Sequence, residues 1–198
     1  MLKDKLENYN IILATKSPRR HFLMKEAGIS YTLSDLHEVE EEFPSGLDKF
    51  EIPVYLSELK SAAYGRDLKP GEILVTADTI VWLDNGVIGK PVDREDAKRI
   101  LQRLSGNMHE VITGVTLRKP GVKHSFYSHT EVWFDRLSRE EIDFYVGQFS
   151  PMDKAGAYGI QEWIGYIGIR EIKGSYFNVM GLPIQKFYRE LEEFIRED

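Results

Sequence analysis

The sequence of 198 residues contains no cysteine. This absence excludes disulfides, zinc–thiolate sites, iron–sulfur clusters and a thiol nucleophile. No run approaches the roughly 18–20 apolar residues that a membrane span needs. The polar N-terminal segment MLKDKLENYN lacks the apolar core of a signal peptide. We therefore expect a soluble, intracellular protein with no membrane partner.

The sequence also lacks an excess of positive charge. It has 26 Lys and Arg against 32 Asp and Glu, a formal net charge of −6. Binding to a nucleic-acid backbone needs clustered cations, so we expect no nucleic-acid partner. A small anionic ligand remains compatible with this charge, because a few local cations suffice for it. The HExxH, GxSxG and Walker-type motifs are absent as well.

The structural signals follow one another with short gaps, and we find no repeat or linker. This organisation predicts a single domain over residues 1–198. Helices are expected to begin after Ser17 and Asp93, with a capping box at Ser138 and Glu141. Apolar or alternating runs predict strands at 11–14, 73–77, 80–88 (a hairpin), 109–117 and 126–134, further helices at about 50–65 and from 183 onward, a loop at 150–160, and a glycine-rich β region after it. The fold class is therefore α/β, a mixed sheet with flanking helices.

One candidate site is the segment Thr15-Lys16-Ser17-Pro18-Arg19-Arg20, where a strand ends and a helix begins. The helix N-terminus offers free N–H groups, and guanidinium groups bind phosphate oxygens in pairs. Three cations are unfavourable beside the positive end of a helix unless an anion is expected there. The segment therefore favours a phosphate site, and the alternative is a solvated basic first turn capped by Ser17.

A second candidate is Asp78-Thr79, expected where the buried strand 73–77 ends. A carboxylate in this place can hold a divalent cation or act as a general base on water. The alternative, at least as favourable on the residues alone, is a turn-forming aspartate.

Two further segments have both a functional and an ordinary interpretation. The acidic run 38–42 fits a solvated face, or a source of oxygen ligands for Mg²⁺ or Mn²⁺. The small residues of 153–161 permit close backbone approach to a ligand, and Gln161 offers a donor and an acceptor for a base edge. The alternative there is an ordinary glycine-rich loop with Lys154 in solvent.

Taken together, these segments resemble the Maf family of nucleoside triphosphate pyrophosphatases. The resemblance covers nearly the whole chain and rests on strings in family order. They are LATKSPRR at 13–20, VEEE at 39–42, the LxxxKSA stretch around Lys60, ADT at 77–79, GKPVDREDA at 89–97, LSG at 104–106, HEVITGV at 109–115, DKAGAYGIQ at 153–161 and GSYFNVMGLP at 174–183.

The resemblance implies an elongated two-lobed body with a central cleft, similar to the inosine-triphosphatase architecture. It implies metal-dependent hydrolysis of a nucleoside triphosphate to the monophosphate and pyrophosphate, with Mg²⁺, Mn²⁺ or Co²⁺, in a cytoplasmic protein that can form a homodimer. Asp78 matches the catalytic acid/base of the family. Arg19, Thr79 and Gln161 match the positions associated with substrate choice, in the combination of the branch acting on dTTP and UTP.

The resulting hypothesis also names the residues that would bind the phosphates and the metal. Phosphates would be bound by Ser17, Arg19, Arg20, Lys60, Lys90 and Lys154, and the metal by Glu41 and Asp78. One alternative is a regulatory nucleotide-binding protein linked to septum formation, with little catalysis. Another is a purine house-cleaning pyrophosphatase of the inosine-triphosphatase type.

Overall fold

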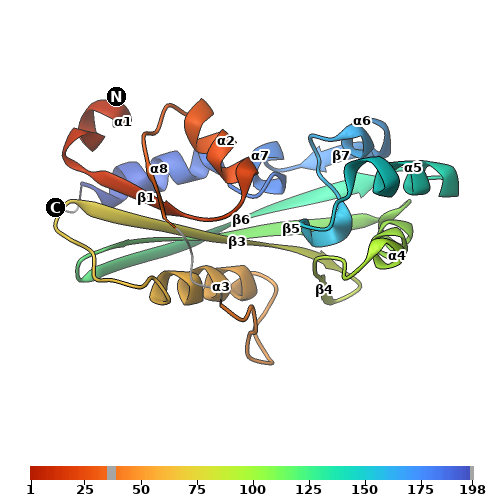
Figure 1. The fold of residues 1–198 in the computed structure, drawn as a ribbon, viewed down its shortest axis with the longest axis horizontal. Helices are drawn as coiled ribbons and strands as arrows, with labels where there is room; N and C mark the ends of the chain where they lie inside the picture. Colours follow the sequence, from red (N-terminus) through yellow and green to blue (C-terminus); the bar gives the residue numbers. More distant parts are fainter. Residues whose placement is uncertain (35–38, 197–198) are drawn as a thin grey trace. The chain divides into compact units, whose positions relative to one another are not determined.

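The computed structural model describes residues 1–34 and 39–196. These residues form a seven-stranded sheet in the order β2-β1-β3-β5-β6-β7, with β4 pairing onto β3 (Figure 1). β1 runs parallel to both β2 and β3, whereas β4 pairs antiparallel with β3 and β7 with β6. The expected α/β class, a mixed sheet with flanking helices, is confirmed.

The elements alternate between strands and helices along the chain. The strands are β1 (Asn10–Ala14), β2 (Thr32–Ser34), β3 (Glu72–Leu83), β4 (Gly86–Ile88), β5 (Met108–Lys119), β6 (Val122–Phe134) and β7 (Ile169–Lys173). The helices are α1 (Leu2–Lys5), η1 (Leu6–Asn8), α2 (Pro18–Glu26), α3 (Glu51–Ala62), α4 (Arg94–Leu104), α5 (Arg139–Phe149), η2 (Ala155–Ala157), α6 (Trp163–Gly168), α7 (Tyr176–Val179) and α8 (Ile184–Phe194). None of the helices in this described part of the chain is long and apolar enough to cross a bilayer.

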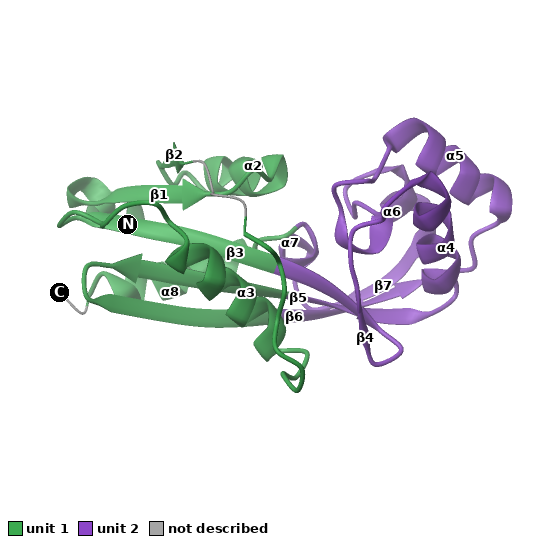
Figure 2. Cartoon of the chain, turned by 60° about the horizontal axis from the view of Figure 1, so that its bottom comes forward, with its two compact units in different colours: residues 1–78, 113–128, 181–198 green, residues 79–112, 129–180 purple. Residues whose placement is uncertain are grey.

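The chain divides into two compact units (Figure 2). Unit 1 contains residues 1–78, 113–128 and 181–198, and unit 2 contains residues 79–112 and 129–180. Three of the four boundaries fall inside strands, in β3, β5 and β6, so each unit contains parts of these strands.

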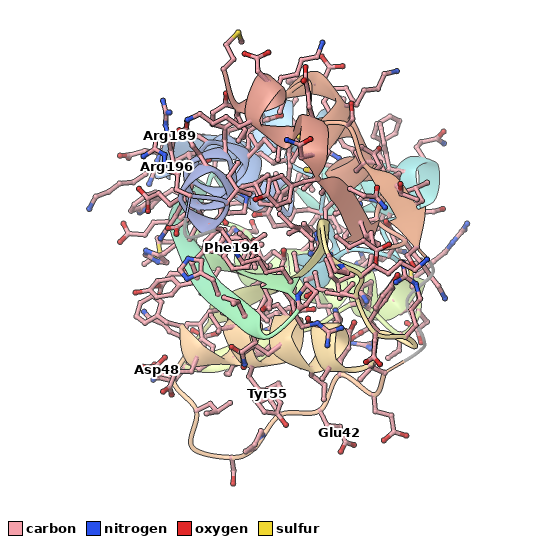
Figure 3. All side chains as sticks on the ribbon, turned by 90° about the vertical axis from the view of Figure 1, so that its left-hand side faces the viewer. Glu42, Asp48, Tyr55, Arg189, Phe194 and Arg196 are labelled. Atoms are coloured by element: carbon pink, nitrogen blue, oxygen red, sulfur yellow. The ribbon has the colours of Figure 1, made fainter. Side chains whose placement is uncertain are left out.

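In unit 1, α3 covers one face of the sheet and α8 the other (Figure 1). Ser57 of α3 shares a hydrogen bond of 2.7 Å with Thr116 of β5. On the opposite face, the Lys119 ammonium donates to the carbonyl of Phe194 at the end of α8, at 3.1 Å. Figure 3 shows Phe194 pointing inward from α8, while Arg189 and Arg196 point outward. The apolar side of the helix thus completes the core on that face.

In unit 2, the core is built around buried aromatic rings. His109 of β5 meets the rings of Phe134 and Tyr158 edge-on, with centroids 5.2 and 5.4 Å away. Helices α4 and α5 lie against each other and are joined by the ion pair Lys98–Asp143 at 2.8 Å.

Two expectations for the strands and helices were wrong. The strand expected at 73–77 does not end before Asp78, because β3 continues without a break from Glu72 to Leu83. The region after the loop is not purely β, since α6 and α7 flank the short β7. Residues 163–168 (WIGYIG) carry aromatic and β-branched side chains that indicate a strand, and the helix they form instead shows that local propensity is overridden here.

Candidate functional site

The first part of the candidate site is a charged cluster in unit 1, and two parallel steps along α3 and β3 produce it. The hydroxyl of Thr76 donates to the carbonyl of Ser57 at 2.7 Å. One helical turn after Ser57 comes Lys60, and two residues after Thr76 comes Asp78. Residues three apart on a helix and two apart on a strand share a face. Lys60 and Asp78 therefore meet by the same packing that joins Ser57 to Thr76.

The Lys60 ammonium forms ion pairs with two carboxylates, Asp78 and Glu41, the latter at 2.8 Å. Both Lys60 and Asp78 are largely removed from water, whereas Glu41 remains partly exposed. Asp78 thus lies inside β3, and the prediction that it follows the end of the strand is corrected. The turn-forming alternative is wrong for the same reason.

Arg20 adds a second cation to this cluster. Its Nε donates to the carbonyl of Gly181 at 2.8 Å, and its Nη1 lies 3.4 Å from the hydroxyl of Thr15. Burial lowers the pKa of Arg20, and Arg19 acts in the same direction, whereas the carboxylates of Asp78 and Glu41 raise it. A guanidinium held by backbone beside two carboxylates is a fixed donor group for an anionic ligand.

The start of α2 is an N-terminus without a side-chain cap. Ser17 occupies the N-cap position in an extended conformation, but its hydroxyl accepts no capping hydrogen bond. Its own N–H donates to the Thr15 hydroxyl at 3.1 Å. The expectation that Ser17 begins the helix is confirmed, whereas its capping bond is not formed. N–H groups at such an end are available to an anion. Lys16 is exposed and Arg19 half-buried beside this end.

The second part of the candidate site is the loop 153–162 of unit 2. The N–H of Gly156 donates to the carbonyl of Gly89 at 3.1 Å, which attaches the loop to the residue before Lys90. A Cβ on Gly156 would lie 2.9 Å from a methyl of Val81, which shares a face of β3 with Thr79. Unit 2 therefore brings the loop close to both the Lys90 segment and the Thr79 strand.

The charged and polar side chains of this loop are held inward. The Lys154 ammonium pairs with Asp153 at 2.7 Å and with Glu162 at 3.2 Å, and the residue is buried. The alternative of an ordinary loop with Lys154 in solvent is therefore wrong about this lysine. Gln161 is half-buried, and among the described residues its carbonyl oxygen Oε1 is buried without a hydrogen-bond partner. Such a buried acceptor is able to take a hydrogen bond from a donor outside the described residues, such as water or a ligand.

Backbone strain marks the same loop. Ala157 adopts a positive φ of 55° and follows Gly156 at 71°. A non-glycine residue in this left-handed region costs about 1 kcal/mol or more and persists where the surroundings impose it. Residues in such conformations cluster at active sites and ligand-binding segments.

The carboxylates that could hold a metal are those of Glu41 and Asp78. Within the described ranges, no group of three or more His, Asp or Glu side chains is arranged to bind a metal. Glu41 and Asp78 nevertheless converge on one cation, the Lys60 ammonium. Mg²⁺ in phosphate-processing sites is held by one or two carboxylates together with phosphate oxygens and water. The pair therefore fits this kind of metal binding. Glu38, at the start of the acidic run, lies outside the described residues.

Sequence reasoning missed the residues that support the loop. Glu162 and Tyr145 contact each other and the loop, and His109 shares a hydrogen bond with Tyr158 inside it. Helical periodicity in 139–149 favours a buried Tyr145, as found in the structure, but it carries no information about a partner 17 residues away.

Comparison with models of protein families identifies the family of the chain. The model described as Maf-like protein matches residues 10–194. The chain belongs to the Maf family. Curated relatives called dTTP/UTP pyrophosphatase include those of Phocaeicola vulgatus (54% identical, covering 96% of this chain and 98% of the relative) and Bacteroides thetaiotaomicron (53%, covering 95% and 97%).

A likeness to a solved structure supports the fold of this Maf chain. A HAM1 protein from Coxiella burnetii aligns with a TM-score of 0.51 at 15% identity, over 93% of this chain and 99% of that protein. At this identity the likeness concerns the fold alone.

Proposed function

We propose that this Maf-family chain hydrolyses nucleoside triphosphates, with dTTP and UTP as its preferred substrates, to the nucleoside monophosphate and pyrophosphate. The observation that carries the proposal is the cluster in which Asp78 pairs with Lys60 and interacts electrostatically with Arg20. A carboxylate held among cations is suited to act on water beside a bound polyphosphate. The names of the relatives support the same reaction.

In the proposed reaction, water attacks the α-phosphorus and the bond to the α–β bridging oxygen breaks. Asp78 orients the water and accepts its proton. The departing pyrophosphate carries negative charge, which the cations offset. In unit 1, the positive charge that offsets it comes from Arg19, Arg20, Lys60 and the N–H groups after Ser17. Lys90 and Lys154 are proposed as further phosphate-binding residues in unit 2.

A divalent cation (Mg²⁺, Mn²⁺ or Co²⁺) is proposed as the cofactor, with Glu41 and Asp78 as its protein ligands. When bound, such an ion neutralises phosphate charge and favours attack at phosphorus. The Lys60 ammonium keeps these two carboxylates together before any ligand arrives.

Base recognition is proposed for Arg19, Thr79 and Gln161. Gln161 carries a buried acceptor without a partner in the described structure. Uracil and thymine present a ring N–H donor beside a carbonyl acceptor, which an amide can match with one acceptor and one donor. We propose a cytoplasmic house-cleaning or regulatory role, and a homodimer as a possible assembly.

The test is a panel of nucleotides incubated with each of the three cations, reading both monophosphate and pyrophosphate. The panel contains dTTP, UTP, CTP, modified pyrimidine nucleotides, ITP and XTP. We expect equal amounts of monophosphate and pyrophosphate, with dTTP and UTP turned over fastest. Saturable binding without pyrophosphate release would instead support the regulatory nucleotide-binding protein. A preference for ITP or XTP would support the purine house-cleaning enzyme.

A further inference from the structure

The residues Gly159–Glu162 form a hydrogen-bonded turn, and Gln161 is its third residue. The N–H of Glu162 donates to the carbonyl of Gly159 at 3.0 Å, which closes the turn. A single phenol then connects both ends of the turn. The hydroxyl of Tyr145 accepts a hydrogen bond from the N–H of Gly159 at 3.0 Å and donates one to the Glu162 carboxylate.

Tyr145 is itself held in one position. It projects from α5, its side chain is fully buried, and its ring stacks on Phe149 with the centroids 5.1 Å apart. Burial raises the pKa of Tyr145, and the hydrogen bond to Glu162 raises it further, so the hydroxyl keeps its proton and remains a donor. The connection to the turn is therefore rigid on the side of the helix.

Glu162 has a second partner through its other oxygen. Its Oε1 lies 3.2 Å from the ammonium of Lys154, while Oε2 accepts from Tyr145. One carboxylate thus links the buried phenol to the loop lysine and flanks Gln161 directly. The Tyr145 hydroxyl therefore holds both Gly159 and Glu162, the residues on either side of Ile160 and Gln161.

The orientation of the Gln161 amide decides which base edge it fits. Uracil and thymine present acceptor, donor, acceptor along the edge used for pairing, whereas cytosine presents donor, acceptor, acceptor. An amide has an acceptor on one side and a donor on the other, so a freely rotating one could serve either base. Discrimination therefore depends on where the turn places the amide relative to the base, and on whether the wrong base leaves buried polar groups unpaired.

We propose that Tyr145 and Glu162 are positioning residues that fix the turn around Gln161 and thereby make the chain select uracil and thymine over cytosine. This inference rests on the proposed function, because it concerns the same substrates. It predicts that loss of the phenol hydroxyl changes the choice of base more than the rate of hydrolysis.

The test compares Tyr145→Phe with the wild type. Phenylalanine keeps the buried ring and removes both hydrogen bonds to the turn. We expect kcat/KM for UTP relative to CTP to fall about tenfold or more, because hydrogen-bond complementarity to the base is what discriminates. The kcat for UTP should stay within about threefold of wild type, since the phenol reaches no phosphate-binding group directly. An unchanged ratio would overturn the inference.

The matched control is Tyr188→Phe, which removes a hydroxyl that accepts from the N–H of Leu2 at 3.2 Å in unit 1. It costs a hydrogen bond of the same kind away from the turn, so its ratio should equal that of wild type. An equal fall in both variants would assign the effect to general loosening and overturn the inference.

A second pair of variants covers the case in which Tyr145→Phe does not fold. Glu162→Gln keeps an acceptor for the phenol, whereas Glu162→Ala removes it. We expect Gln to retain most of the preference for UTP and Ala to lose it, and equal loss in both would contradict the role of the hydrogen bond. If wild type releases pyrophosphate from no nucleotide, the proposed function fails. If wild type and all variants prefer UTP equally, only this inference fails.

Discussion

The ammonium of Lys60 lies against the carboxylate of Asp78, with only 12% of the lysine side chain and 9% of the aspartate side chain exposed. Desolvating two charges is costly, and their attraction offsets that cost only while both are present. Glu41 adds a second carboxylate to the same ammonium at 2.8 Å. Such a partly buried group of three charged side chains contributes little net stability and is typical of a site that binds a charged ligand.

Replacing Asp78 by Asn tests the catalytic assignment. The amide keeps the shape of the side chain but cannot accept the proton of water, so turnover of dTTP should fall about 10²–10⁴-fold, the range expected for a lost general base. Nucleotide binding should persist, because the cations remain. Pyrophosphate release measures the first effect, and calorimetric titration with a non-hydrolysable dTTP analogue measures the second.

The control for this variant is Glu58→Gln, which also neutralises a lysine-paired carboxylate of unit 1. Glu58 pairs with Lys123 at 2.7 Å and accepts from Ser125, and it points to a different side of α3 from Lys60, because residues two apart on a helix do not share a face. Its turnover should match that of wild type. Wild-type turnover in Asp78→Asn would remove Asp78 from the mechanism.

Replacing Lys60 by Met tests the energetic role of the buried ion pair. Asp78 and Glu41 would then lose their shared ion-pair partner and keep Arg20 as a nearby cation, so the free energy of unfolding should fall by about 2–4 kcal/mol. Lys123→Met breaks a more exposed pair with Glu58 and should cost about 1 kcal/mol or less. Urea unfolding of the two variants at neutral pH gives the comparison, and equal losses would contradict the prediction.

The sequence specified best those features that depend on neighbouring residues. Asp93 caps α4 by accepting from the N–H of Asp96 at 2.7 Å, as predicted. The capping box of α5 forms in both directions, between Ser138 and Glu141. Both motifs join residues three apart, so their geometry follows from the chain itself.

The details of the candidate site depended on tertiary packing and could not be read in this way. Asp78 looked like the end of a strand because an acidic residue after ILVTA is typical of one. In the structure Lys60 neutralises it from α3, and β3 can therefore continue through a buried charge. A solvated Lys154 was one of the two interpretations of the sequence, and in the structure Glu162 compensates its charge inside the loop. A counter-ion far along the chain leaves no local signal.

Gly114 of β5 allows α3 to approach the sheet. A Cβ at this position would lie 2.3 Å from the backbone of Pro53, so Gly114→Ala should force the helix and strand apart. We expect a loss of about 2–3 kcal/mol in the free energy of unfolding, as for overpacking of a core. Turnover should also fall, because α3 carries Lys60. Denaturant unfolding and pyrophosphate release measure the two effects.

The matched control is Gly147→Ala on the exposed side of α5, where a Cβ would meet no atom within 4 Å. Alanine is the better helix former, so this variant should gain up to about 1 kcal/mol. If Gly114→Ala were as stable as wild type, the close contact between α3 and β5 would be wrong.

Because His109 is buried in its neutral form, the free energy of unfolding should fall in acid. Burial lowers the pKa of His109 to about 3 from its ordinary value of 6.5, and its Nε2 shares a hydrogen bond of 2.7 Å with Tyr158. The unfolded chain therefore takes up a proton near pH 6.5 that the folded chain refuses until about pH 3. The contribution of neutral His109 is complete above pH 6.5 and declines as the pH falls below it.

The measurement is urea unfolding of wild type and His109→Gln at pH 7 and pH 5. From the linkage relation, wild type should lose about 1–2 kcal/mol more than the variant between these values. Glutamine can keep a hydrogen bond to the Tyr158 hydroxyl but has no proton to gain, and every other titrating group is common to both chains. A difference of zero would mean that the imidazole takes up its proton between pH 7 and pH 5 as readily in the folded as in the unfolded chain. At pH 5 the hydroxyl of Tyr158 would then be only an acceptor, and the loop that carries Gln161 would be held by a charged group.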